Sequence, residues 1–221
     1  MKLTIVAATG GIGRQVLEQA IAAGHDVTAV VRDPSKLPRG VHAAQVDLSS
    51  PDPTALERAL SGSDAVISGL GARKRREAGV ASRGTRAIVE AMQKGGARRL
   101  VVVSAAPVGT VPSPGHPHPP KYDPGDRFLM RHLMGPAVKA ALRWVYTDLA
   151  RMEDTVRDSG LEWTVVRPPK LTNGGLTGTY RTAVGRNVKG GLSVSRADVA
   201  HLMLQLVDKP DAIGQVVGVA N

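Results

Sequence analysis

A glycine-rich segment near the N-terminus constrains the fold of this chain more than any other feature. Residues 3–6 form a short aliphatic run, and the segment Ala-Ala-Thr-Gly-Gly-Ile-Gly follows directly at 7–13. Ile12, Val16 and Leu17 then recur at the spacing of one helical face. In such a strand–turn–helix unit, the glycines permit a tight bend, a close backbone approach to a phosphate, and contact between helix and strand. The segment therefore predicts the first βαβ unit of a nucleotide-binding fold.

The same rhythm of aliphatic runs and helical stretches continues along the chain. Further runs occur at 27–31, 42–46, 65–67, 100–103, 163–166 and 215–219. Helical spacing marks the segments 87–92, 145–156 and 195–207. Aromatic residues make up only 3% of the chain, so the core must be aliphatic, as is typical of buried parallel strands. These patterns predict an α/β fold, a doubly wound parallel-sheet Rossmann fold, with residues 1–221 as one domain.

A proline-rich segment interrupts this rhythm at residues 105–143. Seven of the fifteen prolines lie between Pro107 and Pro124. We expect a long loop insertion that is mobile over 107–126 without ligand and closes as a lid over the substrate side of the site. A short helix is expected within it at 127–133.

The net charge of +10 favours anionic partners. A DNA-binding protein would need a recognition element, and none is found, so the sequence does not favour nucleic acid despite the basic cluster at 73–76. The absence of cysteine excludes disulfides, and no apolar run approaches the roughly 20 residues of a membrane span. His116 and His118 lack a third ligand nearby, so we expect no metal site. The sequence favours a cytoplasmic protein without membrane partners, of undetermined oligomeric state.

Several residues are expected to bind a dinucleotide. The pyrophosphate would lie on the glycine-rich segment, contacted by Thr9, Gly10, Gly11, Ile12 and Gly13. At the end of the second strand, NAD-binding chains usually carry an acid, whereas Arg32 stands here with Lys36 close behind. Both cations can pair with a 2'-phosphate, so we expect NADP(H). The alternatives are a solvated surface arginine and Asp33 as an acceptor for the ribose, although Asp33 lies one position late.

The ends of later strands supply further candidates for the same cofactor. Asp47 and Leu48 follow the third strand and are expected near the adenine, while Leu70 and Gly71 follow the fourth, where backbone can pass close to the dinucleotide. Turn formation alone could also explain these residues. Pro169 follows the sixth strand and is expected to contact the cofactor.

With these elements placed, the chain resembles the atypical short-chain dehydrogenase/reductase group, most closely the flavin reductase/biliverdin-IXβ reductase family. The similarity rests on VRDPSKLP, VDLSSPD, SDAVISGLGAR, GTRAIVEAMQKGGARRLVVVSAA and SGLEWTVVRPPKLTNGGLTGTY, at 31–38, 46–52, 63–73, 84–106 and 159–180. The resemblance implies an NADPH-dependent reductase acting on a planar, conjugated acceptor. Two positions depart from the family: Lys170 stands where mammalian members carry an active-site His, and Ser104-Ala105 replaces a Thr-Ser pair.

Three residues are candidates for the chemistry. Short-chain dehydrogenases use Tyr-x-x-x-Lys, but Tyr146 is followed four residues later by Ala150, so the motif is broken. Tyr146 could still face the substrate or be structural. Ser104 ends a central strand, and Lys170 could hold a substrate carboxylate or neutralise charge, although a turn hydroxyl and a solvated lysine are the alternatives. Glu153 is expected to face solvent or a neighbouring arginine.

The sequence therefore favours an NADPH-dependent oxidoreductase that transfers a hydride to a small conjugated acceptor such as a flavin, tetrapyrrole or quinone. The alternative is a redox sensor resembling NmrA-like regulators, which would bind NADP(H) and a partner without turnover. An isomerase or epimerase would need a proton-transfer pair that the sequence does not reveal.

Overall fold

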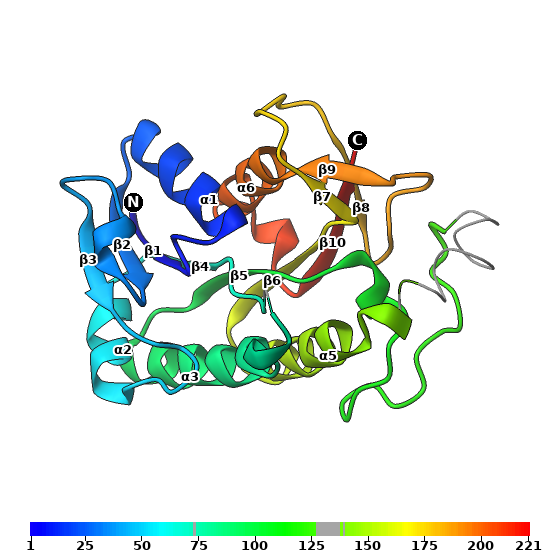
Figure 1. Cartoon of the computed structure of the whole chain (residues 1–221), viewed down its shortest axis with the longest axis horizontal. Helices are drawn as coiled ribbons and strands as arrows, with labels where there is room; N and C mark the ends of the chain where they lie inside the picture. The colour runs from blue at the N-terminus through cyan, green and yellow to red at the C-terminus, as the bar shows by residue number, and fades with distance from the viewer. Residues whose placement is uncertain (73, 127–137, 139) are drawn as a thin grey trace.

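The computed structural model describes residues 1–72, 74–126, 138 and 140–221 (Figure 1). Its strands are β1 (Lys2–Val6), β2 (Asp26–Val31), β3 (His42–Gln45), β4 (Ala65–Ser68), β5 (Arg99–Val103), β6 (Glu162–Arg167), β7 (Lys170–Thr172), β8 (Arg181–Val184), β9 (Ser193–Ser195) and β10 (Gln215–Ala220). Its α-helices are α1 (Gly11–Ala22), α2 (Pro53–Leu60), α3 (Val80–Gly95), α5 (Arg143–Arg157) and α6 (Arg196–Gln205).

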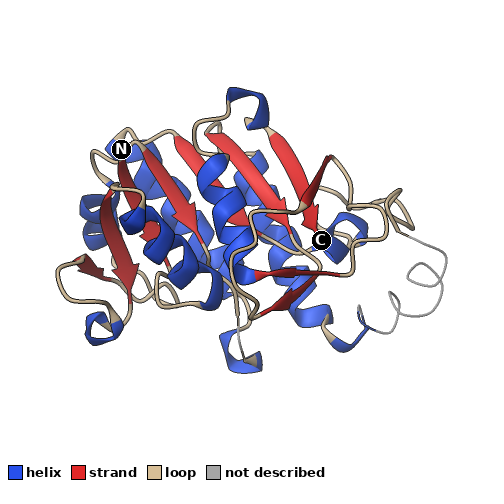
Figure 2. Ribbon diagram, turned by 90° about the horizontal axis from the view of Figure 1, so that it is seen from above, coloured by secondary structure: helices blue, strands red, loops and turns tan. Residues whose placement is uncertain are grey.

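The main sheet has eight strands in the order β3-β2-β1-β4-β5-β6-β10-β8 (Figure 2). All neighbouring pairs are parallel except β10 with β8, which is antiparallel. The order reverses between β1 and β4, and Ile5 of β1 pairs with Ala29 on one side and Ile67 on the other. In open α/β sheets, ligands bind at the carboxyl ends of the strands beside such a reversal. The site is therefore expected where β1 and β4 end.

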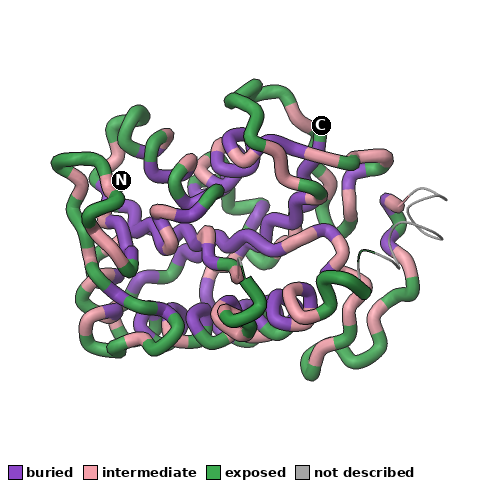
Figure 3. Tube along the Cα trace, in the orientation of Figure 1, coloured by how far each residue is buried: buried purple, intermediate pink, exposed green. Residues whose placement is uncertain are grey.

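Helices cover both faces of the sheet. α1 and α6 lie on one face, while α2, α3 and α5 lie on the other (Figure 1). Each face buries its own aliphatic cluster, one containing Ile5, Val16 and Met203 and the other containing Leu56 and Ile88. Figure 3 shows buried segments in the strands and in the helices that cover them. This arrangement confirms the predicted doubly wound Rossmann fold.

Side-chain hydrogen bonds set the starts of three helices. Asp52 caps α2 by accepting from the backbone N–H groups of Thr54 and Ala55, and Ser195 caps α6 by accepting from Asp198. The first turn of α3 is instead capped from another helix, because Asp148 of α5 accepts from Ala81 N and Ser82 N at 3.0 and 3.1 Å. This last contact fixes α5 against α3.

The sequence patterns missed α2 and the short strands β7, β8 and β9. β7 and β9 pair in a separate two-stranded sheet, and β8 extends the edge of the main sheet. These strands are only three or four residues long, so they carry little periodicity. The helix expected at 127–133 lies outside the described residues.

Two carboxylates, of which Asp123 is buried and Asp154 is partly buried, hold the described part of the proline-rich segment against the body of the protein. Asp123 is 4% exposed and accepts from the backbone N–H groups of Gly125 and Asn187. Ser113 Oγ and Gly115 N both donate to Asp154 of α5. Ligand-free mobility of 107–126 stays a prediction, but these contacts do not favour it.

Candidate functional site

A cavity of about 1140 Å³ opens at the carboxyl edge of the sheet, where the strand order reverses. Residues from the ends of β1, β2, β4 and β5, the start of α1, and the segments around β7 and α6 line it. The volume slightly exceeds the usual range of small-ligand pockets, roughly 300–1,000 Å³, and is large enough for an extended ligand. No described residue of 105–126 lines this cavity, so the structure does not support the expected lid.

The start of α1 faces the cavity, and no side chain caps its backbone N–H groups. Gly10 occupies the N-cap position in an extended conformation, no side chain caps the helix, and its first turn contains no acidic residue. Gly10, Gly11 and Ile12 line the cavity. The positive end of the helix dipole is thus available to an anion, as in phosphate-binding loops.

Gly13 serves a different purpose from the glycines before it. A Cβ atom at Gly13 would lie 2.2 Å from the carbonyl oxygen of Ala7, and one at Gly69 would lie 2.9 Å from Gly13 N. These distances are shorter than any normal contact, so α1 lies on the ends of β1 and β4 only because both positions lack a side chain. This is the role that the sequence predicted for the last glycine of the motif.

Ala7 is the one non-glycine residue with a positive φ among the described residues, at 58°. Its carbonyl accepts from Gly10 N at 2.7 Å, which closes the turn between β1 and α1. An L-residue in this conformation is strained by about 1–2 kcal/mol. The motif therefore contains an alanine where its geometry favours glycine, a feature that the sequence analysis overlooked.

We expect Ala7→Gly to raise the free energy of unfolding by about 0.5–1 kcal/mol, because relief of strain exceeds the entropy that an added glycine gives the unfolded chain. Urea denaturation measures this change. Ala8→Gly provides the control, since Ala8 is buried, has no positive φ, and should lose stability on the same substitution. A loss in Ala7→Gly as large as that in Ala8→Gly would contradict the assignment of strain.

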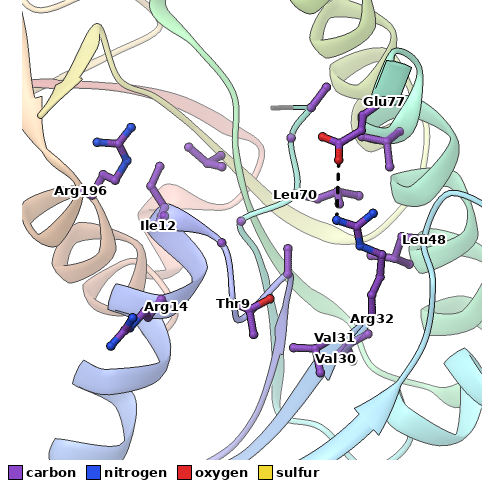
Figure 4. Close-up of a pocket in the computed structure, with 18 of the residues that line it drawn as sticks. Thr9, Ile12, Arg14, Val30, Val31, Arg32, Leu48, Leu70, Glu77 and Arg196 are labelled. Carbon is purple, nitrogen blue, oxygen red and sulfur yellow. Dashed lines mark ion pairs between the residues drawn. The ribbon is translucent and has the colours of Figure 1, made fainter. Parts of the chain in front are cut away.

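Arg32 lies in the cavity at the end of β2, and Lys36 does not. Arg32 Nη2 pairs with Glu77 Oε1 at 3.7 Å, across the cavity wall (Figure 4). Lys36 is not among the lining residues; its Nζ pairs with Asp33 at 3.1 Å. The structure thus brings one of the two expected 2'-phosphate ligands to the site and leaves the other outside.

The remaining residues expected near the nucleotide mostly line the cavity. These are Thr9, Asp47, Leu48, Leu70 and Gly71. Asp47 Oδ1 accepts from both the backbone N–H and the hydroxyl of Ser49, and these hydrogen bonds lower the pKa of Asp47. Asp47 is therefore a charged turn residue at the cavity edge. Pro169 is half-buried and does not line the cavity.

Arginines from distant parts of the chain also converge on the cavity. The described lining contains five of them, Arg14, Arg32, Arg76, Arg83 and Arg196, against two acids, Asp47 and Glu77. The excess of positive charge suits a ligand with several negative charges.

Arg196 was not identified from the sequence. Its Nε would lie 2.8 Å from a Cβ atom at Gly11, and its Nη1 donates to Asn173 Oδ1 at 2.6 Å. In Figure 4, it lies near Ile12 at the start of α1. Arg196 is the first residue of α6, so the packing of α6 beside α1, and no local motif, brings it here.

The opposite side of the cavity is mainly apolar and contains Ser104. The lining residues from β5, α5 and β7 are Val103 and Leu149 and Leu171, with Ser104 directly after β5. Ser104 Oγ donates to Glu153 Oε1 at 2.7 Å. Glu153 is 0% exposed, so the expectation that it could face solvent is wrong, whereas its pairing with neighbouring arginines is confirmed.

Two further candidates for catalysis lie away from the cavity. Tyr146 is buried in the core between α5 and the sheet and does not line the cavity. Burial raises the pKa of the Tyr146 phenol, which makes it a weaker acid still. Lys170 is exposed at the start of β7 and does not line the cavity either. Arg73, a possible further cation, lies outside the described residues.

Neither a cluster of metal ligands nor a membrane-spanning helix is found among the described residues. They contain no group of three or more His, Asp or Glu side chains arranged to hold a metal ion. None of the described helices combines the length and apolar character needed to cross a membrane.

Comparisons with known proteins agree with this geometry. A family model described as NAD(P)H-binding matches residues 7–210. The chain also superimposes on the oxidoreductase ylbE from Lactococcus lactis, with a TM-score of 0.80 and 21% identity over 100% of this chain and 91% of that one. A short-chain dehydrogenase/reductase from Veillonella parvula in complex with NADP gives a TM-score of 0.79 and 17% identity, covering 100% and 94%. ChuY, an anaerobilin reductase from Escherichia coli O157:H7, gives 0.76 and 22%, covering 100% and 97%.

Proposed function

Because this chain belongs to the NAD(P)H-binding family, we propose that it is an NADPH-dependent oxidoreductase whose acceptor is a small conjugated molecule such as a flavin, tetrapyrrole or quinone. The bound cofactor would supply a hydride, and the protein would supply position and electrostatics.

The cofactor would extend along the carboxyl edge of the sheet. The uncapped start of α1 would hold the pyrophosphate, with Arg196 close to Gly11 on the same side. Arg32 would pair with the 2'-phosphate beyond β2. This orientation leaves the nicotinamide towards Ser104, on the apolar side of the cavity. The NADP complex of the Veillonella protein, which shares this fold, supports NADP(H) as the cofactor.

One observation carries the choice of acceptor. The described residues that line the cavity include no tyrosine, histidine or lysine. Reduction of a simple ketone needs a proton donor to act in step with the hydride, because an alkoxide is a strong base. A flavin, quinone or tetrapyrrole spreads the new charge over its conjugated system and can take a proton from water afterwards. The anaerobilin reductase activity of ChuY, on the same fold, also supports an acceptor of this class.

A sensor without turnover is the second candidate. The same lack of a proton donor favours it, since a regulator needs only to bind NADP(H). The net charge of +10 could serve an acidic partner. The two candidates differ in whether NADPH is consumed.

We expect the purified protein to oxidise NADPH with lumiflavin or menadione much faster than with an aliphatic ketone, as followed by NADPH absorbance. Tyr146→Phe should lower turnover by far less than the roughly hundredfold typical of losing a general acid, because Tyr146 lies outside the cavity. Lys170→Ala should likewise lower turnover by far less than a hundredfold, because Lys170 also lies outside the cavity.

Two results would contradict the proposal. Tight NADPH binding without turnover on any acceptor would favour the sensor. Efficient ketone reduction that collapses in Tyr146→Phe would restore a tyrosine acid and change the acceptor class.

A further inference from the structure

Ser104 contacts an ion cluster, centred on the buried Glu153, that the proposed chemistry does not explain. Glu153 of α5 is fully buried and pairs with both Arg157 and Arg167. Arg167 Nε donates to Glu153 Oε1 at 2.8 Å, and Arg157 Nη2 donates to Oε2 at 2.6 Å. The Arg167 side chain is 9% exposed and that of Arg157 is 35% exposed, and ion clusters in such partly buried settings contribute little net stability. The contact of this cluster with a cavity residue therefore suggests a function at the site.

The cluster fixes the direction of the hydrogen bond made by Ser104. The Glu153 carboxylate pairs with two guanidinium groups, and a carboxylate can only accept hydrogen bonds. The hydroxyl proton of Ser104 is therefore directed at Glu153 Oε1, 2.7 Å away. The backbone N–H of Ser104 is held as well, by the carbonyl of Val166 at 2.8 Å. Ser104 thus has no proton to offer a ligand.

The lone pairs of Ser104 Oγ remain able to accept a hydrogen bond from a ligand in the cavity. A serine hydroxyl has one donor and two acceptor positions, and no described residue donates to Ser104 Oγ. Ser104 lines the cavity, and the other lining residues from β5, α5 and β7 are Val103, Leu149 and Leu171. The described side chains from β5, α5 and β7 that line the cavity are thus apolar, and the Ser104 oxygen lies directly beside them as a hydrogen-bond acceptor.

We propose that Ser104 Oγ accepts a hydrogen bond from the substrate that receives the hydride, and that Glu153 is the positioning residue that sets this direction. The site would then select conjugated heterocycles that present an N–H group over those that present only carbonyl oxygens. The inference rests on the proposed function and narrows its substrate class. A quinone offers only acceptors to Ser104, and two facing acceptors repel. Oxidised lumiflavin carries one N–H, at N3, and tetrapyrroles carry pyrrole N–H groups.

The test compares three probes that differ in this group: lumiflavin, 3-methyllumiflavin and menadione. We expect Ser104→Ala to lower kcat/KM for lumiflavin by about three- to tenfold, the range for one neutral hydrogen bond, and to change it little for menadione and 3-methyllumiflavin. Lumiflavin binding, measured by its fluorescence, should weaken by a similar factor, while NADPH binding stays unchanged. Ser104→Thr keeps the hydroxyl and should preserve the preference for lumiflavin.

Glu153→Gln tests the positioning role. The amide N–H of glutamine can donate to Ser104, which frees the hydroxyl proton to point into the cavity. The ratio of kcat/KM for lumiflavin to that for menadione should fall in this variant, whereas purely structural damage would lower both alike. Circular dichroism checks its fold. If the variant does not fold, the Ser104 variants still decide the proposal.

The failures can be told apart. If the unmodified protein oxidises NADPH with none of the probes, the proposed function falls and this inference falls with it. If the unmodified protein oxidises NADPH but Ser104→Ala lowers kcat/KM equally for all three probes, or weakens NADPH binding instead, then Ser104 contacts the cofactor. Either result overturns the inference.

Discussion

Replacing Gly13 with valine is expected to abolish dinucleotide binding. A Cβ atom there would meet the carbonyl oxygen of Ala7 at 2.2 Å, and backbone cannot yield as a flexible side chain would. The start of α1 would have to move away from β1, and the N–H groups that hold a pyrophosphate would move with it. NADPH fluorescence titration should show no saturable binding. Urea denaturation should also show a loss of several kcal/mol, as for other overpacked backbone positions.

Gly175→Val is the matched control for this experiment. Gly175 does not line the cavity, a Cβ atom there would have no atom within 4 Å, and its φ is not positive. NADPH should therefore still bind to Gly175→Val. If a folded Gly13→Val protein binds NADPH normally, the phosphate site does not lie at the start of α1.

Arg32→Ala is expected to weaken NADPH binding by roughly tenfold to a hundredfold and NADH binding very little. Charge-assisted hydrogen bonds to a phosphate contribute about 1.5–3 kcal/mol, and NADH lacks that phosphate. The Arg32 side chain is 62% exposed, so solvent screening favours the lower end of the range. Isothermal titration with both nucleotides measures the difference.

Lys36→Ala provides the control, because Lys36 carries the same charge but pairs with Asp33 outside the cavity. Its loss should change NADPH affinity only slightly. Glu77→Gln should act in the opposite direction to Arg32→Ala, since Glu77 competes with the 2'-phosphate for Arg32. Equal affinities of the unmodified protein for NADPH and NADH would refute the role of Arg32.

The glycine-rich segment shows why part of the site could be predicted. Its function depends on backbone conformation and on the absence of side chains, and both are properties of consecutive residues. The order strand, turn and helix therefore located the start of α1 and assigned the packing role to Gly13. Even here, the strained φ of Ala7 was missed, because alanine gives no sign of it.

Residues at strand ends could be predicted only in outline. Arg32 and Ser104 were found because the carboxyl ends of parallel strands share one edge of the sheet. Lys36 was misplaced because the three residues between it and Arg32 form a turn, and the Lys36 side chain pairs with Asp33. For Lys170 and Tyr146, position in the sequence gave no measure of whether the side chain reaches the cavity.

The sequence by itself determined the fold, the glycine-rich turn at the start of α1 and the presence of Arg32 at the end of β2 beside the cavity, because each depends on local periodicity or on adjacent residues. Tertiary structure alone decided that Glu153 lies buried beneath Ser104 and that Arg196 reaches the start of α1. Forty-nine residues separate Ser104 from Glu153 along the chain. Such contacts form only when α5 and α6 pack on opposite faces of the sheet. The residues next to a side chain in the sequence do not determine how far that packing buries it or which partners it meets.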